Sequence, residues 1–130
     1  MLLVTAGFTV WTLLYISVDN VKSGEIKATY QSLHPLLRLS AGTLFMVDAS
    51  SVITDTARTP EDYTRMGLPT NESSLHFRQD DGYVHALDLR TRSRAEWRNQ
   101  LTTMWFGVLG FKTLRHTGTA DHLHVSLPSR

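Results

Sequence analysis

Histidine and carboxylate side chains occur together in three short stretches of this chain. These are residues 74–76 (Ser-Leu-His), 86–89 (Ala-Leu-Asp-Leu) and 121–124 (Asp-His-Leu-His). Two histidines and one carboxylate that converge in space can hold a metal ion and leave its fourth position open to water or substrate. The sequence therefore predicts a metal site with a reactive position, and a further carboxylate, Asp121, lies close by.

The chain contains no cysteine. Disulfide bonds and thiolate metal sites are thereby excluded, so a zinc ion would have to be held by histidine and carboxylate groups.

The spacing of the candidate ligands suits β-strands. His122 and His124 are two residues apart, so on a strand they point to the same face of the sheet. Asp88 lies between Leu87 and Leu89, and an unpaired carboxylate among apolar neighbours is costly. Three interpretations of Asp88 stay open: a metal ligand, a salt bridge to a nearby arginine (Arg90 or Arg92), and a strand face open to water.

Composition points to one globular domain. The chain has 130 residues, of which 42% are hydrophobic and 19% charged, which is ordinary for a protein with its own core. The formal net charge is +1 without a run of Lys or Arg, so the sequence predicts no nucleic-acid partner.

Residues 1–18 (MLLVTAGFTVWTLLYISV) carry no charge. Their length is at the lower limit for a membrane span, and no basic residue precedes them as in an export signal. Two interpretations stay open: insertion in a membrane or export, and docking on this domain or on a partner. We divide the chain into this apolar segment and a domain over residues 19–130.

Helix signals occur in three places. Ser23 can cap a helix over residues 25–46, in which Pro35 should start a new helix or produce a kink. Thr59 and Pro60 begin a second helix that ends by residue 67. Residues 93–96 (Ser-Arg-Ala-Glu) form a capping-box pattern that opens a third helix to residue 109.

Strand signals occupy the remaining segments. We expect strands at residues 51–54, 111–116 and 122–127, and a hairpin of residues 75–77 with 83–89 around the turn at Gly82. Helices that precede interleaved short strands predict an α+β fold, with a small antiparallel sheet and helices packed on one face.

In its order of motifs the chain resembles the zinc D-alanyl-D-alanine carboxypeptidases and L-alanyl-D-glutamate endopeptidases. These enzymes cut peptidoglycan peptides and share a metal site with lysostaphin-type enzymes and the hedgehog domain. The similar segments, over roughly residues 25–127, are 33–36 (Leu-His-Pro-Leu), 52–59 (Val-Ile-Thr-Asp-Thr-Ala-Arg-Thr), 74–76 as S-x-H, 86–89 as A-x-D-[LI] and 121–124 as [DE]-x-x-H. Five ordered motifs are more specific than one, although each is a hypothesis.

The resemblance implies a zinc site of His76, Asp88 and His124, with Asp121 as general base. The separation of His76 from Asp88 exceeds that of the family motif, so His85 is the alternative ligand. Because His85 is three residues before Asp88, the two would point to opposite faces of a regular strand.

The resemblance also implies roles for residues around the metal. Arg58 would bind the scissile carbonyl as it gains negative charge, Ser74 would contact the substrate, and His122 would line the pocket and stabilise the transition state.

The expected function is zinc-dependent cleavage of peptidoglycan stem or cross-bridge peptides, in a cell envelope, the periplasm or a virion. The alternative is a non-hydrolytic zinc-bearing module of an envelope or virion assembly. In that case residues 1–18 would provide the contact with a membrane or an assembly partner.

Overall fold

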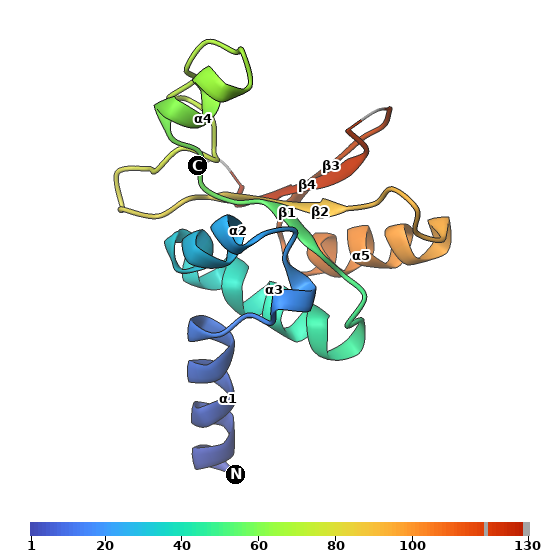
Figure 1. Cartoon of the computed structure of the whole chain (residues 1–130). Coiled ribbons are helices and arrows are strands. Elements are labelled where there is room, and N and C mark those ends of the chain that lie inside the picture. Colours follow the sequence, from blue (N-terminus) through green and yellow to red (C-terminus); the bar gives the residue numbers. More distant parts are fainter. Residues whose placement is uncertain (119, 129–130) are drawn as a thin grey trace.

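A computed structural model describes residues 1–118 and 120–128 and has the predicted α+β class. Its sheet has four antiparallel strands in the order β1-β2-β4-β3. The strands are β1 (Ile53–Asp55), β2 (Ala86–Arg90), β3 (Lys112–His116) and β4 (His122–Ser126). Helices α2 (Gly24–Thr29), α3 (Pro35–Val47) and α5 (Glu96–Val108) lie beneath one face of the sheet (Figure 1). Helix α4 (Pro60–Arg65) lies above its other face at one end.

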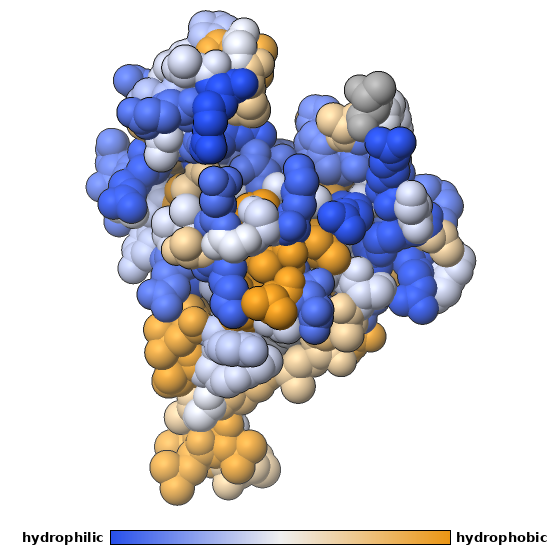
Figure 2. Space-filling model, viewed as in Figure 1, coloured by the Kyte–Doolittle hydropathy of each residue, from blue (hydrophilic) through white to orange (hydrophobic). Residues whose placement is uncertain are grey.

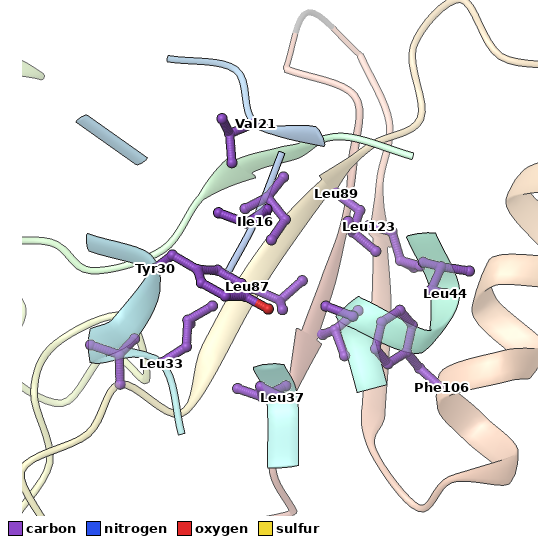
Figure 3. Close-up of a cluster of buried hydrophobic side chains, with 14 residues drawn as sticks. Ile16, Val21, Tyr30, Leu33, Leu37, Leu44, Leu87, Leu89, Phe106 and Leu123 are labelled. Carbon is purple, nitrogen blue, oxygen red and sulfur yellow. The ribbon is translucent and has the colours of Figure 1, made fainter. Parts of the chain in front are cut away.

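Alternation along the central strands separates the core from the open face. Leu87 and Leu89 of β2 and Leu123 of β4 are fully buried and point toward the helices (Figure 3). Val125 of β4 is fully buried in the same core. Burial of each such side chain stabilises the fold by roughly 1.5–3 kcal/mol. The residues between them, including Asp88, therefore face away from the helices.

The predicted helical segment over residues 25–46 forms two helices separated by a short turn, and the predicted new helix at Pro35 is confirmed. The structure has α2 (Gly24–Thr29), a short 3-10 turn (Tyr30–Ser32) and α3 (Pro35–Val47). Ser23 caps α2, as predicted, and Pro35 begins α3. Proline has no N–H to donate and so suits the first turn of a helix better than its interior.

Helix α4 (Pro60–Arg65) begins as its sequence predicts. The Thr59 hydroxyl accepts from the Asp62 N–H, and the Asp62 carboxylate accepts from the Thr59 N–H. This reciprocal capping fixes the start of the short helix that follows Arg58.

The predicted capping box at residues 93–96 does not form. Ser93 has a φ of +62° and α5 (Glu96–Val108) starts later, with Ala95 at its N-cap. A turn in which the Arg94 N–H donates to the Thr91 carbonyl precedes the helix, so Ser93 lies too early to cap it.

The predicted strand at residues 75–77 is also wrong, since this segment is a turn. The Phe77 N–H donates to the Ser74 carbonyl, and the one bridge of the expected hairpin joins Arg78 to Val84. Gly82 has a φ of +82° in the turn between them, a conformation that glycine adopts without strain.

The N-terminal segment forms α1 (Leu2–Leu14), a helix that projects from the body and is apolar along its surface (Figures 1 and 2). Leu2 is 88% exposed, whereas Thr12 near the other end is buried against α3. No helix in the described part of the chain is both long and apolar enough for a bilayer span.

We predict that Gly42→Ala destabilises the contact between α1 and α3. A Cβ atom at Gly42 would lie 2.8 Å from the Cβ of Thr12, and overpacking of this kind costs about 1–3 kcal/mol. Gly7→Ala in α1 is the matched control, because a Cβ there meets nothing within 4 Å and alanine favours helix. Thermal unfolding should show a lower melting temperature for Gly42→Ala only, and equal stability of both variants would contradict this packing.

Candidate metal centre

Three side chains from separate parts of the chain form a compact group of ligand atoms. Asp88 Oδ1 lies 2.9 Å from His124 Nδ1 and 3.2 Å from His76 Nε2, and the two ring nitrogens are 3.2 Å apart. Ligands of a tetrahedral ion with bonds near 2.1 Å are about 3.4 Å apart. His76, Asp88 and His124 therefore have the spacing of three metal ligands, and this group could hold a metal ion.

The register of the sheet brings two of these ligands together. Asp88 of β2 is the direct cross-strand partner of His124 in β4. Their strand neighbours are buried against the helices, so both side chains lie on the opposite face of the sheet. His122 lies two positions before His124 in β4 and shares its face, as their spacing predicted.

His76 reaches the same point from the turn after α4. It is only 3% exposed, and its Nδ1–H donates to the Thr56 carbonyl at 2.6 Å. A second hydrogen bond of this kind fixes the ring and leaves Nε2 for the metal. The Thr56 carbonyl was not identified from sequence, because a backbone group leaves no signal in residue type.

The site holds its carboxylate in the charged form. Burial disfavours ionisation of Asp88, but hydrogen bonds from His124 and His76 outweigh it and hold the pKa of this carboxyl well below its usual range. Burial also opposes the charged form of His76, yet the hydrogen bond with Asp88 raises the pKa of this imidazole. A divalent cation would take the place of the proton on Nε2.

His85, the alternative ligand, lies outside this group. Its Nε2 is 2.7 Å from Asp81 Oδ2, and its ring packs edge-on against His34. The long separation between His76 and Asp88 is taken up by the turns around Gly82, so the geometry selects His76.

The arginine beside Asp88 is Arg58. The salt-bridge interpretation of Asp88 from sequence names Arg90 or Arg92 as the partner. The Nη2 of Arg58 lies 2.6 Å from Asp55 Oδ2 and 3.6 Å from Asp88 Oδ2. Burial opposes its charge, but the carboxylate of Asp55 more than compensates and raises the pKa of the guanidinium. A permanent positive charge therefore stands at the edge of the site.

His122 also faces the site. Its Nε2 lies 3.6 Å from Asp88 Oδ2, and its Nδ1 bonds with the Ala120 carbonyl. The ring stacks on His116 with centroids 4.6 Å apart. His116 has no assigned role in the predicted site, although its register opposite His122 places it on the same face.

Asp121 lies apart from the three ligands. Its carboxylate accepts from Arg115 Nε at 2.7 Å, from Arg115 Nη2 at 3.0 Å and from the Thr91 hydroxyl at 2.6 Å. Arg115 is opposite the buried Leu123 and also contacts Glu96 of α5. Asp121 therefore turns toward the helix-covered face of the sheet, and its role as general base stays a prediction.

Ser74 shapes the turn that carries His76. Its hydroxyl accepts from the His76 N–H at 3.3 Å, and its carbonyl accepts from the Gln79 side chain. Ser74 is partly exposed beside the buried ligand, and its contact with a substrate stays a prediction.

Comparison with known proteins adds no relative. No protein-family model, no curated protein and no solved structure matches this chain.

We predict that His76→Ala lowers the affinity for zinc by more than the 10–100-fold that is typical for loss of an outer partner of a metal ligand. His85→Ala is the matched control and should bind zinc as the unmodified protein does, because His85 pairs with Asp81. Titration of both variants with zinc in a calorimeter measures the difference. A large loss in His85→Ala, with His76→Ala unchanged, would reverse the assignment.

We also predict a loss of stability in acid that depends on Asp121. Hydrogen bonds from Arg115 and Thr91 lower its pKa to about 2, whereas an unfolded aspartate has a pKa of about 3.9. Because the folded pKa is the lower one, the stabilisation is complete above about pH 4 and is lost as the pH falls toward 2. Asp121→Asn should flatten the melting temperature against pH in this window, and an unchanged slope would contradict the pairing.

Proposed function

We propose that this protein is a zinc-dependent peptidase that cleaves peptidoglycan stem or cross-bridge peptides. The observation that carries the proposal is the triangle of His76, Asp88 and His124 ligand atoms on the face of the sheet away from α2, α3 and α5. The proposal includes a metal-site arrangement like that of the D-alanyl-D-alanine peptidases and the hedgehog domain.

The donor set favours zinc among common metals. Two imidazole nitrogens and one carboxylate oxygen match the ligands of catalytic zinc sites, which keep a fourth position for water. A structural zinc site more often closes with a fourth protein ligand. A group of three ligands, of which His124 is partly exposed, therefore supports catalysis better than a closed structural site.

Zinc, when bound, supplies a Lewis acid that polarises a carbonyl and acidifies water at its open position. The residues of the chain then have to move a proton and stabilise developing negative charge. Arg58 is suited to the second task, because its guanidinium stays charged and Asp55 holds it in place beside Asp88.

For proton transfer we propose His122 ahead of Asp121. The Nδ1 of His122 is bound to a backbone carbonyl, so Nε2, which faces the site, is the nitrogen available for proton transfer. Asp121 would first have to leave Arg115 and Thr91, which hold it deprotonated and turned away. A base must lie within hydrogen-bond reach of the water that it activates.

The substrate class rests on the ordered motifs that resemble the peptidoglycan peptidases. An open sheet face accepts an extended peptide more readily than a deep pocket would. Such a substrate places the protein in a cell envelope or a virion.

The second candidate function is a non-hydrolytic zinc-bearing module of an envelope or virion assembly. Two observations favour it: the engagement of Asp121 by Arg115, and the exposed apolar surface of α1. In that case α1 is a docking element and zinc stabilises the β2–β4 pairing without turnover.

We predict that the zinc-loaded protein releases amine groups from purified peptidoglycan, that a chelator stops the release, and that added zinc restores it. His122→Ala should keep zinc and lose about 10²–10⁴-fold in rate, which is the usual contribution of general acid–base catalysis. Asp121→Asn should stay within a few-fold of the unmodified rate.

The opposite order of the two variants would return the role of base to Asp121. No cleavage of peptidoglycan from several cell-wall types, with zinc bound and the fold intact, would contradict the peptidase and favour the binding module.

A further inference from the structure

We infer that Arg90 binds the terminal carboxylate of the substrate, which makes the protein a carboxypeptidase that removes one residue from the C-terminal end of a peptide. This inference rests on the proposed peptidase function and specifies its substrate class.

Arg90 lies on the same face of the sheet as the metal ligands. It is the last residue of β2, two positions after Asp88, and so it shares the orientation of Asp88. Its cross-strand partner in β4 is His122, which borders the site. Arg90 is exposed while the three residues before it are buried.

The guanidinium of Arg90 has no ion pair or side-chain hydrogen bond with any residue in the ranges 1–118 and 120–128. Arg58 and Arg115 differ from Arg90, because each has a carboxylate partner. Arg58 is held by Asp55, and Arg115 by Asp121. Arg90 is therefore the arginine of this face that is available to a ligand, and a planar guanidinium suits a carboxylate in a two-point contact.

The distances suit a single residue beyond the scissile bond. Residues two apart on a strand are about 6.7 Å apart, and consecutive Cα atoms of a peptide are about 3.8 Å apart. If the scissile carbonyl is at the metal, the carboxylate of the next residue lies between the metal and Arg90, within reach of the arginine side chain. An internal peptide segment would present a neutral backbone to this charge.

The room for the rest of the peptide lies on the other side of Asp88. A groove of about 800 Å³ runs between α2 and α4 along β1, and its lining includes Asp55, Arg58 and Lys22. Asp55, the last residue of β1, is opposite Asp88. Because β1 and β2 are antiparallel, the residues that follow Asp55 continue away from the Arg90 end of β2. Arg58 lines this groove and also lies 3.6 Å from Asp88, so we place the N-terminal part of the peptide in the groove and its carboxylate end at Arg90.

The reaction is ordinary hydrolysis. The water oxygen joins the carbonyl carbon of the last peptide bond, the C–N bond breaks, and the released amino acid leaves with the proton on its amine. Arg90 touches the carboxylate of that leaving residue and so determines specificity.

The test compares two probes, an N-acetylated tripeptide that ends in D-alanyl-D-alanine and the same peptide with an amidated C-terminus. Both are offered to the zinc-loaded full chain and to its Arg90→Met, Arg90→Lys and Arg78→Met variants. Arg78 is the matched control, since it is also exposed and has no ion-pair partner among the described residues. Binding is measured by calorimetry, and KM and kcat from amine release.

We expect the unmodified protein and Arg78→Met to prefer the free acid by at least about tenfold. Arg90→Met should remove this preference by weakening binding of the free acid and raising its KM, with kcat nearly unchanged. Arg90→Lys should restore part of the preference.

The inference is overturned, while the peptidase remains, if the zinc-loaded protein binds the free-acid peptide and the amidated peptide equally well. It is also overturned if Arg90→Met keeps the preference. If the acid binds through Arg90 and neither peptide is cleaved, the carboxylate site stands and the peptidase fails. Failure to bind zinc overturns both.

Discussion

The antiparallel pairing of β2 with β4 is the constraint on which both the core and the site depend. The same register that places Leu87 opposite Val125 and Leu89 opposite Leu123 also places Asp88 opposite His124. A slip of one residue would turn the leucines to water and the ligands into the core. The burial of the apolar side chains therefore also fixes the relative positions of Asp88 and His124, two of the three candidate metal ligands.

The charge of Asp88 links this pairing to the rest of the site. The carboxylate is almost fully buried, which would be costly if it were unpaired. His76, His124, His122 and Arg58 surround it at 2.9–3.6 Å. A bound metal ion would add a further positive charge where the two ring nitrogens and the carboxylate oxygen converge.

The sequence predicts the parts of this arrangement that depend on local pattern. Strand alternation predicted the shared face of His122 and His124, and the Thr59 capping box and Pro35 predicted two helix starts. It could not predict partners set by tertiary contact. The pairing of Asp121 with Arg115 and the free position of Arg90 depend on register across the sheet. The bond from His76 to the Thr56 carbonyl depends on how the turn at residues 74–77 packs against the end of β1. The patterns at residues 75–77 and 93–96 were misleading because turns prevailed there over a strand and a cap.

The proposed zinc site consists of His76, Asp88 and His124, and X-ray absorption at the zinc edge of the zinc-loaded protein measures its first shell. We expect one zinc per chain, with two imidazole nitrogens and carboxylate or water oxygens at about 2.0–2.2 Å. A stoichiometry below one, or a first shell without two imidazoles, would contradict it.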